Sequence, residues 1–495
     1  MTGVHRVEQS HPDLPAMVAD WFRGGRGNPL LEYDGIWHPG EVLADLAADL
    51  DRLLADAGIA IGAPIGIVAR NRPGIAAAIL GLVAAGRSIT MIYAAQSPDA
   101  MAGDIARLGL AAIVADPDDW SDAQRAAAAE AGSLAVAAAL SGGVTVVAAG
   151  NGAPRAPFAE AGIEMLTSGT TGAPKRILIG YTVLERAAES FRLGAKGEAP
   201  TVQIVSHPFG NISGICQLTG SAVAGAPIAL LERFTVPAYI AAIGRHRPPL
   251  MALAPPAVGM ILDANVPPEA LAGVGAVFGG GGALSAETQA AFEARYGIPV
   301  YWGYGATEFG GTLIRWTPDM HREFGVTKRG SVGRVMGGAE IRVVDAVSGA
   351  ALEIGERGLM EGRVALMGPD WIRTTDLVSI DADGFVWHHG RADGAIVRGG
   401  FKILPEVVAD ALRTHPAVAD AAVVGRADAR LGHVPVAAVE IRPGAATPSP
   451  AELEAHLRRT LAATHIPVEI RILDALPRTP SLKVSLGDIR RLFGG

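Results

Sequence analysis

Short apolar segments alternate with helical segments along much of the chain, and this alternation restricts the possible fold more than any other feature. We predict a strand at residues 64–70, a helix at 73–85 and a second strand at 88–93. The same order of strand, helix and strand recurs between residues 227 and 253. Chains with this rhythm form layered α/β structures, so we expect helices packed on largely parallel sheets.

The length of the chain requires more than one domain. Its 495 residues exceed the size at which a single core stops growing, and 49% hydrophobic residues can fill sizeable cores. Near residue 390 the pattern changes to short strands and helices, including a helix at 405–414 and a strand at 418–424. We therefore predict a large N-terminal domain of several subdomains at residues 1–391 and a small α+β domain at residues 392–495.

Charge and cysteine content exclude several classes of protein. The net charge of −8 argues against a nucleic-acid-binding protein, which depends on a basic face. The single cysteine, Cys216, allows no intrachain disulfide and favours the cytoplasm. The longest uncharged stretch, residues 132–150, is interrupted by Ser141-Gly142-Gly143, so we expect a helix, a turn and a strand there and no membrane span. The oligomeric state is left open, a homodimer included.

A loop rich in hydroxyl groups and glycine follows the predicted strand at residues 163–166. It runs from Thr167 to Lys175 with the sequence TSGTTGAPK. Its hydroxyls, backbone N–H groups and lysine are the donors that polyphosphate oxygens require, although an ordinary turn rich in glycine and threonine is an alternative. It is not a Walker loop, because Lys175 follows Pro174 and no serine or threonine comes next.

Further motifs follow the loop in a fixed order. They are Tyr304-Gly-Ala-Thr-Glu308, Arg373-Thr-Thr-Asp-Leu377, Asp383 to Arg391, Gly399-Gly-Phe-Lys402 and Arg478 to Lys483. In this order they resemble the adenylate-forming superfamily of acyl- and aryl-CoA synthetases, peptide-synthetase adenylation domains and luciferases. The resemblance extends from residue 40 to the C-terminus.

The resemblance implies a nucleotide site. The phosphate-binding residues would be Thr167, Ser168, Gly169, Thr170, Thr171, Gly172 and Lys175, with Thr170 and Lys175 also catalytic. Glu308, also expected to be catalytic, would hold Mg²⁺, since this ion prefers hard oxygen ligands. Tyr304, Gly281 and Gly282 would contact the adenine, and Gly305 and Thr307 would also bind the nucleotide. Asp376 and Arg391 would bind the ribose, and Lys483 would bridge the reacting carboxylate and the α-phosphate as a catalytic residue.

The implied activity is ATP-dependent ligation of a carboxylic acid to coenzyme A. The acid attacks the α-phosphate of ATP, pyrophosphate leaves, and the thiol of coenzyme A then displaces AMP from the acyl-AMP. In this family the small domain is a mobile lid that rotates between the two steps, which assigns the hinge to Asp393 and the coenzyme A path to Gly399, Gly400 and Lys402. The alternatives are loading of a carrier protein, or a homologue that binds nucleotide with weakened catalysis.

The acyl pocket is expected to involve Phe209, Asn211, Ile212, Trp302 and Gly305. Relatives restricted to acetate carry tryptophan where this chain has Gly305, so the missing side chain predicts an apolar pocket deeper than acetate needs. The acid itself stays open between fatty, branched, aryl and steroid-derived compounds. Three positions depart from the family pattern: Arg176 and Leu482 replace glycine, and Asn211 replaces histidine.

The string His388-His389-Gly-Arg-Ala-Asp-Gly394 also matches the HHxxxDG signature of acyl-transfer enzymes. Short motifs of this kind arise by chance. Because the flanking residues follow the adenylate-forming pattern, we favour the ligase.

Overall fold

The computed structural model describes residues 13–94, 96–150, 155–166, 176–192, 201–282, 284–398, 401–428, 431–480 and 482–494. Contacts divide the chain into two compact units. In terms of the described residues, unit 1 ends at residue 233 and unit 2 begins at residue 234.

A seven-stranded sheet forms the centre of unit 1, in the order β7-β6-β5-β3-β4-β8-β9. Its strands are β3 (Ile65–Val68), β4 (Ile89–Ile92), β5 (Ala112–Ala115), β6 (Leu134–Ala139), β7 (Gly143–Ala148), β8 (Gly162–Leu166) and β9 (Arg176–Gly180). The inner strands are parallel, and the edge strands β7 and β9 are antiparallel to their neighbours. All residues of β3, β4 and β5 are buried, as expected for parallel strands covered on both faces.

Helices and a smaller sheet complete unit 1. The helices are α1 (Leu14–Gly24), α2 (Gly40–Asp56), α3 (Pro73–Ala84), α4 (Pro98–Leu108), α5 (Asp122–Glu130), α6 (Tyr181–Arg192) and α7 (Ile212–Val223). The smaller sheet has the order β10-β11-β1-β2, from β1 (Pro29–Tyr33), β2 (Ile36–Pro39), β10 (Gln203–Val205) and β11 (Ile228–Leu230). Helix α3 is buried from Gly74 to Val83, which explains why its sequence is apolar on every face.

The segment at residues 132–150 corrects the sequence prediction. A helix, a turn and a strand were expected, but the structure has two antiparallel strands, β6 and β7. Alanine favours helices by less than 1 kcal/mol per residue over most other residues, so tertiary contacts override this preference readily. Residues 135–138 are buried between β5 and β7, and this burial decides the structure. The predicted strands and helix between residues 64 and 93 are confirmed.

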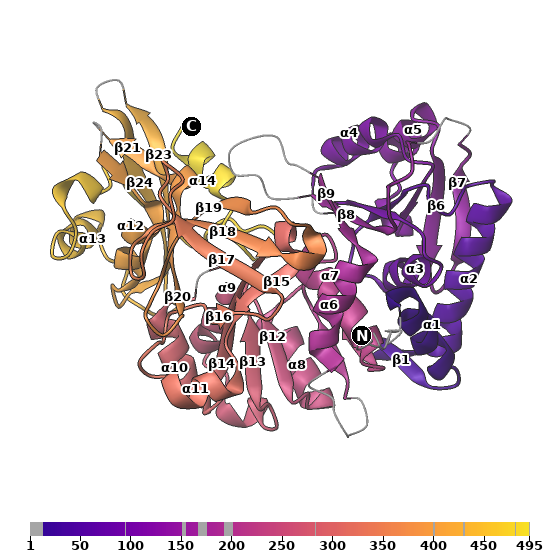
Figure 1. Ribbon diagram of the computed structural model, residues 1–495, viewed down its shortest axis with the longest axis horizontal. Coiled ribbons are helices and arrows are strands. Elements are labelled where there is room, and N and C mark those ends of the chain that lie inside the picture. The colour runs from indigo at the N-terminus through magenta and orange to yellow at the C-terminus, as the bar shows by residue number, and fades with distance from the viewer. Residues whose placement is uncertain are drawn as a thin grey trace, which may run out of the picture. The chain divides into compact units, whose positions relative to one another are not determined.

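Unit 2 begins with a mixed sheet in the order β12-β13-β14-β15-β16. Its strands are β12 (Leu250–Leu253), β13 (Ala276–Gly279), β14 (Val300–Ala306), β15 (Gly311–Arg315) and β16 (Arg334–Val335), and its helices are α8 (Val236–His246), α9 (Pro255–Asp263), α10 (Ala286–Tyr296) and α11 (Pro318–Phe324). An antiparallel sheet follows, formed by β17 (Ala339–Val344), β18 (Gly358–Val364), β19 (Ile372–Ile380) and β20 (Val386–Arg391) (Figure 1).

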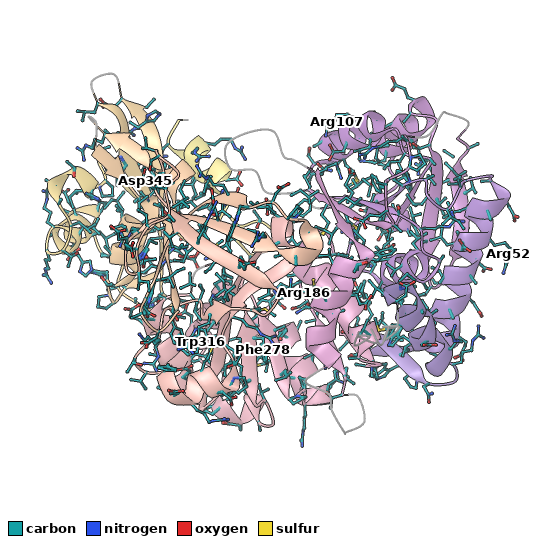
Figure 2. The ribbon with its side chains drawn as sticks, viewed as in Figure 1. Arg52, Arg107, Arg186, Phe278, Trp316 and Asp345 are labelled. Carbon is teal, nitrogen blue, oxygen red and sulfur yellow. The ribbon has the colours of Figure 1, made fainter. Side chains whose placement is uncertain are left out.

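A buried aromatic contact joins these two sheets of unit 2. Trp316 follows β15, is 1% exposed and donates its indole N–H to the carbonyl of Ser331 at 2.9 Å. Its ring lies 5.0 Å from that of Phe385, which directly precedes β20. Figure 2 labels Trp316 among the side chains of this unit. The contact holds β20, and with it Arg391, against the first sheet.

The C-terminal segment has its own sheet and core. Strands β21 (Ile396–Arg398), β22 (Phe401–Ile403), β23 (Val418–Asp428), β24 (Gly432–Ile441) and β25 (Ile470–Leu473) are covered by α12 (Pro405–Arg413), α13 (Pro450–Leu457) and α14 (Leu486–Leu492). Val408, Leu412 and Leu453 lie in its core, but its contacts place it in the same unit as residues 234–391. The boundary at residue 391 therefore stays a prediction.

Helices in the described part of the chain are all too short or too polar to cross a membrane.

Substitutions at two glycines of unit 1 test how closely its helices pack. A Cβ at Gly74 would lie 2.4 Å from the carbonyl oxygen of Ala138, whereas a Cβ at Gly103 in α4 would meet no atom within 4 Å. We expect Gly74→Ala to destabilise the protein by about 1–3 kcal/mol through overpacking. Gly103→Ala should be neutral or stabilising by up to about 1 kcal/mol. Denaturant midpoints measured by circular dichroism check this, and equal midpoints for the two variants would contradict it.

Candidate active site

The motif at residues 304–308 lies where β14 ends. Tyr304 and Gly305 belong to this strand, and Thr307 and Glu308 belong to the 3₁₀ turn Thr307–Phe309 that follows. Phe309 is 2% exposed and anchors the turn in the core. The motif thus presents its polar residues at the end of a strand, as expected for residues that contact a ligand.

Asp376 on β19 is the centre of a hydrogen-bonded cluster. The Tyr304 hydroxyl donates to Asp376 Oδ2 at 2.6 Å, and His388 Nε2 lies 3.1 Å from Asp376 Oδ1. The backbone N–H of Gly390 donates to His388 Nδ1, which leaves the proton of the neutral ring on Nε2, facing the carboxylate. The rings of Tyr304 and His388 are stacked, with centroids 6.1 Å apart.

These contacts keep the buried carboxylate ionised. Burial alone would raise the pKa of Asp376, but the hydrogen bonds from His388 and Tyr304 outweigh it and hold the pKa below its ordinary value. The pKa of Tyr304 is raised in turn, first by burial and then by the charge of Asp376. A fixed negative charge and a protonated phenol therefore lie side by side.

Two cations lie beside this cluster. Arg391 on β20 lies opposite Asp376 on β19 in the strand register. Its Nη2 donates to Thr375 Oγ1 at 2.5 Å. Lys483 comes from the loop before α14 and retains an exposed surface. Partial desolvation lowers the pKa of Lys483, Arg391 lowers it further, and Asp376 acts in the opposite direction. Unit 2 thus brings together Tyr304, Asp376, Arg391 and Lys483, which are distant in sequence.

The glycine run after β13 packs under Trp302. A Cβ at Gly279 would lie 2.0 Å from the Trp302 ring, and the Trp302 indole N–H donates to the carbonyl of Gly282 at 3.0 Å. Gly281 has φ +79°, a conformation that suits glycine. Trp302 is 2% exposed and folds against this run. Contact of Gly281 and Gly282 with adenine stays a prediction.

Gly305 has a structural explanation that the sequence did not reveal. A Cβ there would lie 2.3 Å from the carbonyl oxygen of Gly311 on the paired strand β15. The close pairing of β14 and β15 therefore requires glycine. The predicted depth of the acyl pocket does not follow from this residue.

The other predicted pocket residues belong to unit 1. Phe209 is fully buried, and its backbone N–H donates to Asn71 Oδ1 at 2.9 Å. Asn211 precedes α7, and Ile212 is the first residue of that helix. Nearby, burial lowers the pKa of His207 to about 4, as expected for a core histidine. The pocket wall formed with Trp302 and Gly305 stays a prediction.

Several predicted site residues lie outside the described residues. They are Thr167, Ser168, Gly169, Thr170, Thr171, Gly172, Lys175, Gly399 and Gly400, together with the side chains of Asp393 and Lys402. Arg176, which follows the loop, donates to the carbonyl of Met91 at 2.9 Å and lies 3.8 Å from Glu164. These contacts tie the start of β9 to β4 and β8, which accounts for arginine at a position where the family has glycine.

Among the described residues, the candidate for holding a metal ion is a single carboxylate. No group of three or more His, Cys, Asp or Glu side chains within them could bind an ion. Mg²⁺ at nucleotide sites usually needs only one or two carboxylates beside the phosphate oxygens. Glu308, at the turn after β14, fits this role.

Sequence reasoning missed the contact between His388 and Asp376, although it noted both residues. The only signal was the pair of histidines, which suggested acyl transfer. His389 Nε2 lies 2.8 Å from Ser379 Oγ, and burial is the first cause that lowers the pKa of His389 to about 4. A base this weak gives acyl transfer no support.

Comparisons with known proteins identify the family. Residues 5–370 match the model of the AMP-binding enzyme family, and residues 408–483 match the AMP-binding enzyme C-terminal domain. The chain belongs to the AMP-binding enzyme family. This confirms the predicted superfamily.

Relatives of this AMP-binding enzyme are CoA ligases. The probable 2-succinylbenzoate–CoA ligase of Mycobacterium tuberculosis is 34% identical over 343 residues, which cover 67% of this chain and 85% of the relative. The sulfoacetate–CoA ligase of Cupriavidus necator is 31% identical over 468 residues, which cover 89% and 90%. The predicted function, ATP-dependent ligation of an acid to coenzyme A, and the predicted enzyme class, an AMP-forming acid–thiol ligase, are confirmed.

A solved structure supports the fold. The o-succinylbenzoate CoA synthetase of Bacillus subtilis, in complex with an acyl-adenylate, aligns with a TM-score of 0.78 at 23% identity, covering 98% of both chains. The predicted α/β architecture is therefore confirmed.

The lowered pKa of Asp376 predicts a pH-dependent contribution to stability. A carboxylate with a depressed pKa stabilises the folded state above its unfolded pKa, and this stability is lost as the pH falls through the folded value. Asp376→Asn should therefore be less stable than the wild type at pH 7, and the difference should shrink below about pH 4. Denaturant midpoints between pH 7 and pH 3 measure this, and a difference that stays constant would contradict it.

Proposed function

We propose that this AMP-binding enzyme joins an aromatic carboxylic acid to coenzyme A through an acyl-AMP intermediate, with ATP and Mg²⁺. The observation that carries the proposal is the hydrogen-bonded cluster at Asp376, to which the Tyr304 hydroxyl donates at 2.6 Å, with Lys483 near enough to interact with the charge of Asp376. If Asp376 binds the ribose, Lys483 beside it would face the α-phosphate of the nucleotide.

Asp376 would hold the ribose of ATP. Each of its oxygens already takes part in one contact, with Tyr304 or with His388. A carboxylate has about four lone-pair positions, so two remain for the two sugar hydroxyls. The existing contacts fix the direction of these lone pairs before the nucleotide arrives.

In the first step, an oxygen of the acid forms a bond to the α-phosphorus, and the bond from that phosphorus to the pyrophosphate oxygen breaks. Lys483 as an ammonium group would offset the charge that develops on the α-phosphate oxygens, with Arg391 nearby. Thr167, Ser168, Thr170, Thr171 and Lys175 would hold the leaving pyrophosphate. Mg²⁺, when bound at Glu308, supplies further charge neutralisation.

In the second step, the thiolate of coenzyme A attacks the acyl carbonyl and AMP leaves with the electron pair. We assign the approach of coenzyme A to the segment with Gly399, Gly400 and Lys402, and the movement of residues 392–495 to a hinge at Asp393. We also place the enzyme in the cytoplasm, on the basis of its single cysteine, Cys216.

The class of acid is inferred from the relatives. Among them are ligases named for 2-succinylbenzoate and for indoleacetate, and structural neighbours include anthranilate and benzoate CoA ligases. These acids share an aromatic ring. Sulfoacetate, the substrate named for another relative, is the main competitor.

The role of Lys483 can be tested separately for each half-reaction. Lys483→Ala should lower ATP–pyrophosphate exchange by about a hundredfold or more, because a preorganised charge acts mainly in the transition state. Formation of the thioester from supplied acyl-AMP should be retained. Arg490→Ala, which removes an exposed cation from α14, is the matched control and should leave both rates unchanged. An unchanged rate of ATP–pyrophosphate exchange in Lys483→Ala would contradict the catalytic role assigned to Lys483.

The acid can be identified with a panel of free acids and coenzyme A. We expect kcat/KM for 2-succinylbenzoate, indoleacetate or benzoate to exceed that for sulfoacetate and acetate by at least about tenfold, since each buried methylene contributes about 0.8 kcal/mol. Formation of the CoA thioester measured by mass spectrometry is the readout. Preference for sulfoacetate or acetate would refute the aromatic class. Exchange without thioester on free coenzyme A would favour a carrier protein, and no exchange with any acid would favour a weakened homologue.

A further inference from the structure

The loop that carries Lys483 is a narrow turn between β25 and α14. The N–H of Thr479 donates to the carbonyl of Lys483 at 2.7 Å, and the N–H of Ser485 donates to the carbonyl of Pro477 at 2.8 Å. Arg478 and Val484 face each other across the turn. The position of Lys483 therefore depends on what holds the opposite arm of the turn, residues 477–479.

Arg478 connects this turn to the sheet of the C-terminal segment. Its Nη1 donates to the carbonyl of Leu482 at 3.2 Å, directly before Lys483. Its Nη2 donates to Asp420 Oδ2 at 2.7 Å and lies 3.3 Å from Glu440 Oε2. Asp420 is on β23 and Glu440 is on β24, so one guanidinium group links two strands to the residue preceding the lysine.

The carboxylates that hold Arg478 are themselves fixed. Arg413 on α12 donates from Nε to Asp420 Oδ1 at 2.9 Å, and the N–H of Leu476 donates to Glu440 Oε2 at 2.9 Å. Burial would raise the pKa of Asp420, but Arg413 and Arg478 outweigh it and lower the pKa. The side chain of Arg478 is 19% exposed, so this network is little screened by solvent.

Leu482 shows that the turn needs this restraint. Its φ is +63°, in the left-handed region, which residues with a side chain rarely adopt. Such conformations persist where the surrounding contacts hold them. The contact from Arg478 to the Leu482 carbonyl acts directly on this residue.

We propose that Arg478 is a positioning residue for Lys483, which locks the turn onto the sheet and holds the ammonium group in place for the first half-reaction. The inference rests on the proposed role of Lys483. A misplaced lysine would lose stabilisation of the transition state, while most contacts to ATP remain. The expected signature is therefore a lower kcat for ATP–pyrophosphate exchange with little change in KM for ATP.

The test compares Arg478→Lys and Arg478→Met with a matched control, Arg426→Met. Arg426 lies on β23 and pairs with Glu469, away from the turn. Arg478→Lys keeps the charge near the carboxylates but cannot supply the planar fork that also reaches Leu482. Each variant is measured for exchange kcat, KM for ATP, thioester formation from supplied acyl-AMP and melting temperature.

We expect both Arg478 variants to lower the exchange kcat by at least tenfold, with KM for ATP within threefold and the second half-reaction within twofold of the wild type. Arg478→Lys should do so with a melting temperature near that of the wild type, and Arg426→Met should keep the wild-type rate. If the wild type is active and Arg478→Lys keeps the same exchange kcat, the inference is overturned while the proposed function stands. An equal loss in both half-reactions would also overturn it, since it indicates a general structural effect. Wild type that fails to exchange with every acid would overturn the proposed function as well.

Discussion

The ionised carboxylate of Asp376 is the constraint around which this part of the structure is arranged. A buried charge is costly unless it is bonded, and Asp376 is 8% exposed. Tyr304 and His388 meet this cost from β14 and β20, so the end of the mixed sheet is tied to the antiparallel sheet through one side chain. The same bonds aim the carboxylate, which couples the stability of the fold to the geometry of the site.

The cations near Asp376 prepare this region for an anion. Arg391 and Lys483 lie beside a single carboxylate, and Arg391 disfavours the charge on Lys483. A polyphosphate bound here, as proposed, would offset this repulsion between the cations. The network of Arg478, Asp420 and Glu440 provides the support that keeps the lysine in this unfavourable place. Stability of the C-terminal sheet and electrostatics of the site thereby depend on common residues.

A residue that departs from the family pattern can be interpreted only from the contacts that it makes in the structure. Arg176 takes the place of glycine and links β9 to the carbonyl of Met91. Leu482 takes the place of glycine and keeps a left-handed backbone. Conversely, the missing side chain at Gly305 suggested a deep acyl pocket, but the carbonyl of Gly311 leaves no room for a side chain there. Substitutions near an active site can thus report on packing as readily as on chemistry.

The sequence by itself determined the α/β alternation, the family and the identity of Tyr304, Asp376, Arg391 and Lys483 as candidates, because local apolar patterns and short motifs carry that information. Only the tertiary structure decided that residues 134–139 form a strand, since burial in a sheet outweighs the helix preference of alanine. It also decided the partners of Asp376 and Arg478. The hydrogen bond between Arg478 and Asp420 spans 58 residues of chain, and no local pattern encodes a contact of that range.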